Sequence, residues 1–153
     1  MIRCVNTLQQ HEISESSHRI LNAFTDEKLM LLGEICRLRP GQQQLDLASG
    51  KGEMLCRWAE RFGTGGLGVD ISDVFVPAAR ARATELGVDD RVRFVHADAS
   101  TFVAEPAAYD VVSCGPSVPL VTPLPSGSGV TGMNSSRNRV RRPNIWSFSV
   151  VNR

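Results

Sequence analysis

The stretch of this 153-residue sequence best suited to chemistry is LDLASGKGEML, residues 45–55. An apolar run ends at Asp46 and Leu47, small residues follow, and a helical pattern begins after them. This order predicts a strand, a tight turn and a helix. Gly50 and Gly52 lack a Cβ, so the backbone there can take positive φ and a ligand can approach it closely. The helix that follows directs its free N–H groups at the turn, which favours a nucleotide-like ligand.

The spacing of the small residues separates this turn from two other nucleotide-binding turns. A dinucleotide fingerprint, G-x-G-x-x-G, would need a glycine where Leu55 stands. A phosphate loop would need Gly-Lys-Ser/Thr at a set distance from its first glycine, and the sequence does not have it there. The remaining alternative to a ligand site is a tight strand–helix connection that binds nothing.

A second acidic residue lies where a ribose-binding carboxylate is expected. Asp70 ends the apolar stretch 65–70, about twenty residues beyond the glycine turn. One carboxylate can accept hydrogen bonds from both ribose hydroxyls, which no neutral side chain does equally well. The alternative is a helix-capping or surface carboxylate.

Strand and helix patterns alternate along residues 19–114 and predict an α/β fold. Apolar runs at 65–70, 92–99 and 109–114 predict further strands, separated by short loops and helical patterns. Such an order is typical of a doubly wound, mostly parallel sheet, in which ligands bind beyond the carboxyl ends of the strands. The candidate residues at these ends are Asp46, Gly50, Asp70, Asp98 and Cys114.

Together these patterns resemble the class I S-adenosylmethionine-dependent methyltransferases over about residues 19–114. The motif D-x-A-x-G-x-G that begins at Asp46 is similar to the family's first motif, an acidic residue followed by G-x-G-x-G, with Ala48 in place of the first glycine. A third strand ending in Ala-Asp-Ala and a fourth reading YDVV resemble later motifs. The resemblance implies methyl transfer from S-adenosylmethionine, with these residues at the cofactor: Asp46, Ala48, Ser49, Gly50, Gly52, Asp70, Ile71, Asp98, Ala99 and Cys114.

The same resemblance implies roles for some of these residues, but it identifies neither a catalytic residue nor the methyl acceptor. It places Asp70 at the ribose, Asp98 at the adenine amino group, and Cys114 beside the methyl donor and the substrate. A side chain at Gly50 or Gly52 would enter the space of the cofactor's methionine part. A small-molecule acceptor is favoured, and protein or RNA stays open. A catalytically inactive cofactor-binding fragment and a nucleic-acid-binding protein are the alternative functions.

The N-terminal region is expected to be less regular. Residues 1–18 show no persistent period and predict a loose arm, with His11 and His18 as surface histidines rather than metal ligands. Residues 19–38 carry a helical pattern in which Thr25 can cap a helix. The apolar residues near one face of this helix are Leu29, Leu32, Ile35 and Leu38. Three apolar residues before the cap are expected to form a helical turn over the glycine turn or to pack in the core: Ile20, Leu21 and Phe24.

Several other side chains have simpler expected roles. Trp58 and Phe62 recur at helical spacing and are expected to face the sheet. Ser72 can cap the next helix. On that helix, Arg80 and Arg82 are expected to form a solvated face.

The cysteines and the apolar runs indicate the class of protein. No two of the four cysteines have C-x-x-C spacing, so neither a zinc site nor a disulfide framework is expected. The start of the chain has no apolar core of signal-peptide length, and no run is long enough to cross a bilayer. We therefore expect a soluble, cytoplasmic protein with reduced cysteines.

The charge is divided unevenly behind a net value of +1. Residues 1–110 carry 12 Lys and Arg and all 16 acidic residues, whereas residues 111–153 carry five Arg and no acid. Pro, Ser, Gly and Arg dominate residues 115–153, which predict either a disordered tail that contacts nucleic acid or a segment not native to the domain, from a shifted frame or a truncation. We favour the second. The sheet would then stop after its fourth strand, leaving 109–114 as an exposed edge that favours self-association.

Overall fold

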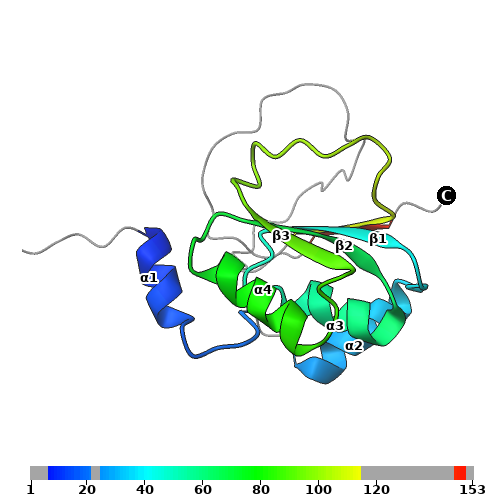
Figure 1. Cartoon of the computed structure of the whole chain (residues 1–153), viewed down its shortest axis with the longest axis horizontal. Coiled ribbons are helices and arrows are strands. Elements are labelled where there is room, and N and C mark those ends of the chain that lie inside the picture. Colours follow the sequence, from blue (N-terminus) through cyan, green and yellow to red (C-terminus); the bar gives the residue numbers. More distant parts are fainter. Residues whose placement is uncertain (1–6, 22–24, 115–146, 151–153) are drawn as a thin grey trace, which may run out of the picture.

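The computed structural model describes residues 7–21, 25–114 and 147–150, which form an α/β fold (Figure 1). The elements in chain order are α1 (Thr7–Ser14), α2 (Asp26–Ile35), β1 (Gln43–Leu47), α3 (Glu53–Phe62), β2 (Gly65–Asp70), α4 (Phe75–Glu85), β3 (Val92–His96), β4 (Val111–Cys114) and β5 (Ser147–Val150). The predicted α/β class and the alternation of strands and helices along residues 26–114 are confirmed.

The sheet reverses its direction of growth at β1. Its strand order is β3-β2-β1-β4-β5, so β1 lies between β2 and β4. These strands run parallel, and Leu47 at the end of β1 lies opposite Val69 on one side and Cys114 on the other. The chain therefore builds β2 and β3 outward on one side before it returns for β4. In open α/β sheets ligands bind beside such a reversal, at the carboxyl ends of the strands.

The strand β5 differs from the sequence-based prediction. It pairs antiparallel with β4, with Val111 opposite Val150 and Cys114 opposite Ser147. The prediction that β4 is an open edge is therefore wrong, and self-association through that edge loses its basis. Strand pairing uses backbone N–H and C=O groups, so four residues of extended chain suffice, whatever their composition. The rest of the predicted tail, residues 115–146 and 151–153, lies outside the described residues.

Helices α2, α3 and α4 lie on the same side of the sheet (Figure 1). Between α3, α4 and the sheet, Leu55 and Cys56 pack with Ala79 and Phe94 in a buried cluster. The helix α4 begins at Phe75, with Val74 in the N-cap position predicted for Ser72. The Ser72 hydroxyl still accepts hydrogen bonds from the Val74 and Phe75 N–H groups, 3.2 and 3.0 Å away, at the start of the helix. This cluster fixes the two helices that follow β1 and β2.

A second buried cluster joins α3 to α2 rather than to the sheet. The Trp58 indole is fully buried and donates a hydrogen bond to the carbonyl of Leu29, 2.9 Å away, and Phe62 packs against the same cluster. The prediction that Trp58 and Phe62 face the sheet is therefore wrong. Because α3 is buried on two faces, its apolar spacing does not tell which neighbour each side chain meets.

The cap of α2 is confirmed, but its predicted buried face is only partly so. The Thr25 hydroxyl accepts a hydrogen bond from the Lys28 N–H, 3.4 Å away. Leu29 is buried, whereas Ile35, predicted on the same face, is 67% exposed. Helix α2 lies as a single layer over α3, so the stripe of its residues that is buried is narrower than the stripe of apolar residues in its sequence.

Residues 7–14 form the helix α1, where the sequence predicts a loose arm. The residues of α1 show no clear apolar stripe. Polar contacts hold it instead: the Ser72 hydroxyl donates to a Glu12 carboxylate oxygen at 2.6 Å, and the edge of the His11 ring lies against Phe75. His11 is thus half-buried rather than a solvated surface histidine. Contacts of this kind leave no periodic signal in the sequence.

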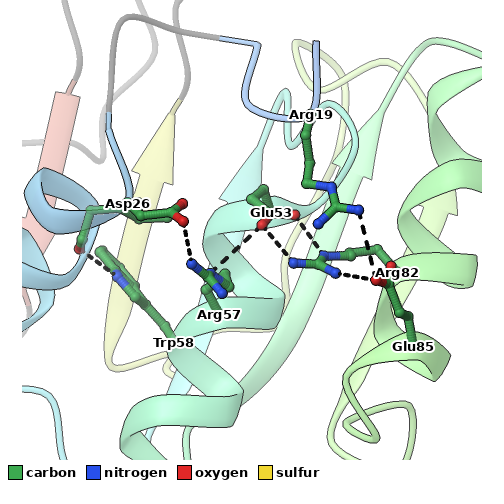
Figure 2. A network of polar contacts seen from close by, with 8 residues as sticks. Arg19, Asp26, Glu53, Arg57, Trp58, Arg82 and Glu85 are labelled. Carbon is green, nitrogen blue, oxygen red and sulfur yellow. Dashed lines mark hydrogen bonds and ion pairs between the residues drawn. The ribbon is translucent and has the colours of Figure 1, made fainter. Parts of the chain in front are cut away.

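Arg82 was expected to be solvated, and the structure buries it beside Glu53. Figure 2 shows the two side chains facing each other between α3 and α4. The Arg82 guanidinium donates to both Glu53 carboxylate oxygens, at 2.8 and 2.9 Å, and also contacts Glu85. These hydrogen bonds raise the pKa of Arg82, so its guanidinium stays charged. Arg80 is exposed, as expected, and donates to the carbonyl of Phe94.

Among the described residues, none of the helices is long and apolar enough to cross a membrane.

Candidate functional site

The turn after β1 holds three alternate residues in the left-handed region. The φ angles are 55° at Ala48, 56° at Gly50 and 72° at Gly52. Glycine takes such angles freely, whereas a residue with a Cβ loses about 1–2 kcal/mol there. Ala48 therefore stands at a position where the backbone favours glycine, and its small side chain limits the cost.

The N–H groups of this turn point into the protein. Ser49 donates to the carbonyl of Val69 at 3.1 Å, Gly50 to a carboxylate oxygen of Asp70 at 2.7 Å, and Gly52 to the carbonyl of Ser49 at 3.0 Å. A phosphate loop instead leaves such groups directed at the ligand. The geometry agrees with the sequence in separating this turn from phosphate-binding loops.

The small size of the glycines serves packing against this chain's own residues. A Cβ on Gly52 would lie 2.5 Å from the Phe94 ring and 2.8 Å from Ala79, and a Cβ on Gly50 would lie 2.6 Å from Leu21. The sequence predicts that a side chain at Gly50 or Gly52 would enter the space of the ligand. In the structure such a side chain would also collide with residues of the chain itself. At Gly52 the core excludes them.

Asp70 connects the end of β2 to the glycine turn. Its carboxylate is 7% exposed and accepts two backbone hydrogen bonds, from Gly50 at 2.7 Å and from Ser72 at 2.9 Å. An ionised carboxylate offers about four acceptor positions. The remaining positions are held in a fixed orientation, which suits a ligand that presents two neighbouring hydroxyl groups. This is the feature of the chain that best fits a nucleoside.

Other predicted residues follow the ends of neighbouring strands. Ile71, directly after β2, is 45% exposed, and its carbonyl lies 2.8 Å from Nε2 of His96 at the end of β3. Asp98 and Ala99 follow β3, and Asp98 accepts hydrogen bonds from the N–H and the hydroxyl of Ser100, at 2.8 and 2.7 Å. These bonds lower the pKa of Asp98. Since adjacent strands lie about 4.8 Å apart, these residues share one edge of the sheet with Asp70.

Asp46 lies inside the fold rather than at its surface. The side chain is 3% exposed and accepts a hydrogen bond from the Ser113 hydroxyl at 2.6 Å, while the Gln44 amide donates to that same hydroxyl at 2.8 Å. Burial raises the pKa of Asp46 to about 7, and the charge of Asp70 adds to the rise, whereas the Ser113 hydroxyl opposes it. Burial also raises the pKa of the neighbouring Cys114 thiol. Asp46 therefore joins β1 to β4 beneath the turn.

Three residues at the site were not predicted from the sequence: Lys51, Ser113 and Glu12. The Lys51 ammonium donates to the carbonyls of Glu15, Ser16 and His18, at 2.7, 3.1 and 2.6 Å. Each of these contacts joins residues more than 30 positions apart, so no local spacing reveals them. Of the apolar residues expected to cover the turn, Leu21 lies next to Gly50, Ile20 forms no helical turn, and Phe24 lies outside the described residues.

Within residues 7–21, 25–114 and 147–150, no three His, Cys, Asp or Glu side chains are grouped so that they could hold a metal ion.

The comparison with known families decides the membership of the chain. The family model described as a methyltransferase domain matches residues 45–125, more than half of the sequence. The chain belongs to this methyltransferase family. The resemblance to class I methyltransferases drawn from the strand-end motifs is thus confirmed, and the matched region includes the glycine turn and Asp70.

Individual methyltransferases and relatives match the same part of the chain. YjhP of Escherichia coli (strain K12) is 52% identical over 102 residues, which cover 67% of this chain and 41% of YjhP. A crystal structure of a SAM-dependent methyltransferase from Thiobacillus denitrificans in complex with S-adenosyl-L-homocysteine has a TM-score of 0.66 at 35% identity, covering 72% of this chain and 55% of that one. The corresponding complex from Geobacter sulfurreducens has a TM-score of 0.63 at 40% identity, with coverages of 68% and 53%. The chain thus spans about half the length of these proteins.

Proposed function

We propose that this chain binds S-adenosylmethionine at the carboxyl ends of β1, β2 and β3 and acts in methyl transfer. The observation that carries the proposal is the Asp70 carboxylate, fixed by the Gly50 N–H of the glycine turn and by Ser72. Two similar methyltransferases, from Thiobacillus denitrificans and Geobacter sulfurreducens, hold S-adenosyl-L-homocysteine in their crystal structures. When bound, the cofactor supplies a methyl group already activated by the sulfonium charge.

Under this proposal the residues at the strand ends hold and orient the cofactor. Asp70 accepts hydrogen bonds from the ribose hydroxyls, the exposed side chain of Ile71 contacts the base, and Asp98 with Ala99 lies at the adenine edge. Backbone at Ala48 and Gly50 lines the methionine part. Because the donor is already activated, alignment of donor and acceptor is the chain's main contribution to rate.

The favoured acceptor is a small molecule. Segment 8–21 lies against the glycine turn through the contacts of Leu21 and Lys51. Under this proposal the segment limits access to the cofactor, which suits a small acceptor better than a folded protein or a duplex. The expected cytoplasmic location stays a prediction from the sequence.

Titration calorimetry with S-adenosyl-L-homocysteine tests the cofactor assignment. Asp70→Asn keeps the shape of the side chain but replaces one acceptor oxygen by a donor, and we expect a loss of about 2 kcal/mol, roughly 30-fold in Kd. Asp73→Asn makes the same charge change on an exposed neighbour and serves as the matched control. Equal melting temperatures for the two variants would show that the loss is not unfolding. No binding by the parent chain would contradict the proposal.

A labelling experiment tests the acceptor class. The purified chain is incubated with methyl-labelled S-adenosylmethionine and separate small-molecule, protein and RNA fractions of a bacterial extract. We expect label in the small-molecule fraction. Label in protein or RNA would replace the small-molecule acceptor, and cofactor binding with no label in any fraction would favour the catalytically inactive alternative.

A further inference from the structure

Lys51 belongs to the glycine turn, but its ammonium binds another part of the chain. It lies between Gly50 and Gly52, yet its side chain turns away from the sheet edge and toward the N-terminal segment. The ammonium has three N–H donors, and the structure provides three carbonyl acceptors for them, in Glu15, Ser16 and His18. The ammonium also lies over the Phe75 ring, with Nζ 5.7 Å from the ring centre.

These carbonyls belong to the turn that follows α1, whose last residue is Ser14. One of them, the Glu15 carbonyl, also accepts a hydrogen bond from the His18 N–H at 3.0 Å. A compact ammonium can satisfy several of them at once, whereas a planar guanidinium is less suited to three acceptors that converge on one point. Lys51 therefore joins the turn after α1 to the glycine turn, a contact that spans more than 30 residues of sequence.

Segment 8–21 has little apolar burial of its own to hold it in place. None of its residues is buried, and Ile13 on α1 is 68% exposed. Its other contacts include the Glu12–Ser72 hydrogen bond, the edge of His11 on Phe75, the approach of Leu21 to Gly50 and an exposed ion pair between Arg19 and Glu85. With few apolar contacts, the three charged hydrogen bonds of Lys51 have a large share in the position of the segment.

The contacts of Lys51, Leu21 and Glu12 are made to residues around the proposed cofactor. Gly50 and Lys51 belong to the glycine turn, and Ser72 is the residue whose N–H binds Asp70. Movement of segment 8–21 away from the turn requires the Lys51 hydrogen bonds to break. A ligand held at Asp70 and the turn would leave more readily once they are broken.

We propose that Lys51 is a positioning residue, which holds segment 8–21 across the glycine turn and thereby slows release of the cofactor. The slower release of the cofactor rests on the proposed function. The hold on segment 8–21 does not, because it is a property of the chain without ligand.

Three variants separate the parts of the proposal. Lys51→Met keeps the length and the apolar stem of the side chain and removes its charge and donors. Lys51→Arg keeps a positive charge and donors. Lys28→Met is the matched control, because Lys28 is the only other lysine of the sequence and lies exposed on α2. Melting temperatures establish that all three variants are folded.

The first measurement is backbone hydrogen exchange of segment 8–21 without ligand. We expect about tenfold faster exchange in Lys51→Met, an intermediate rate in Lys51→Arg and the parent rate in Lys28→Met. Equal rates in Lys51→Met and the parent would overturn the hold on the segment, whether or not the chain binds a cofactor.

The second measurement is the dissociation rate of S-adenosyl-L-homocysteine, followed by displacement in a stopped-flow instrument. We expect dissociation about tenfold faster from Lys51→Met, with partial recovery in Lys51→Arg. Faster exchange with an unchanged dissociation rate would overturn the positioning role and leave a purely structural contact. No binding by the parent would contradict the proposed function and the positioning role together, while the exchange result would still decide the hold on the segment.

Discussion

At the scale of single residues, the acid of the first motif has a structural use in addition to any contact with a ligand. Asp46 is enclosed under the turn, bonded to Ser113, which in turn accepts from Gln44. Such a group keeps its charge only at a cost in desolvation, so burial raises the pKa of its carboxyl. The pair also ties β1 to β4 at the place where the sheet reverses its direction.

The raised pKa of Asp46 makes the stability of the fold depend on pH. Its pKa rises from 3.8 to about 7. Between these values the folded state holds a proton that the unfolded state has released, so the free energy of unfolding falls as pH rises from about 4 to about 7, by at most about 1.4 kcal/mol per pH unit. Asp46→Asn should remove this slope. Urea unfolding at pH 5, 6, 7 and 8 measures the difference between variant and parent.

Asp89→Asn provides the control for this prediction, because Asp89 is exposed and the substitution makes the same change of charge. Its unfolding free energy should follow that of the parent at every pH. A parent and an Asp46→Asn variant with parallel pH profiles would contradict the assignment of the titration to Asp46.

Residue by residue, the sequence reveals what local chemistry dictates. Gly50 and Gly52 stand out because positive φ requires them, and Asp70 because its spacing from the turn is set by one strand and one helix. Arg82 and Lys51 could not be assigned, since the buried partner of Arg82 and the carbonyl partners of Lys51 are 29 or more residues away, and a charged residue on a helix or turn is most often solvated. Only the folded chain brings these partners together.

At the scale of elements, the contact of α2 with α3 depends on one glycine. A Cβ on Gly33 would lie 2.8 Å from Cζ of Phe62 and 3.1 Å from Nε1 of Trp58. Glycine in mid-helix normally loses about 1 kcal/mol relative to alanine. Here the absent Cβ allows the two helices to approach, and the Trp58 indole to reach the carbonyl of Leu29.

Gly33→Ala should therefore destabilise the fold, against the usual helix preference. We expect the free energy of unfolding to fall by about 1–3 kcal/mol, because the added methyl group overpacks a buried contact. Urea unfolding measures the change. Phe62→Leu combined with Gly33→Ala should recover part of it, since the smaller side chain makes room. A stabilised Gly33→Ala variant would show that the ring of Phe62 moves aside without cost.

The elements themselves were largely predictable, and their partners were not. The glycine at position 63, which takes a φ of 70° after α3, and Thr25 before α2 mark helix ends by their own conformational preferences. The orientation of Trp58 was mispredicted because apolar spacing marks the buried side of α3 but does not tell whether each side chain meets the sheet or α2. The helix α1 was missed because polar contacts, rather than an apolar stripe, hold it.

At the scale of the whole molecule, the sheet joins two parts of the chain that differ sharply in composition. Residues up to 114 follow the alternation of the methyltransferase family, and β5 comes from the segment without acidic residues. The parallel crossovers from β1 to β2 and from β2 to β3 could be predicted, because each runs from a strand through a helix to a strand, whereas residues 97–110 between β3 and β4 hold no helix. The pairing of β5 could not be, since any extended segment can supply an antiparallel edge.

The position of β5 gives a prediction that backbone substitutions can test. In an antiparallel ladder the N–H groups of consecutive residues point to opposite sides, so one of Phe148 and Ser149 directs its N–H at β4. Replacing both, Phe148→Pro and Ser149→Pro, must remove a ladder hydrogen bond and should lower the free energy of unfolding by about 1–3 kcal/mol. It should also open the edge of β4 and increase self-association, seen as faster sedimentation at higher protein concentration.

The pair Phe148→Ala and Ser149→Ala removes the same side chains but keeps both N–H groups, so it controls for lost packing. If the proline and alanine pairs unfold and sediment alike, β5 contributes no backbone pairing to the sheet, and β4 is an edge after all.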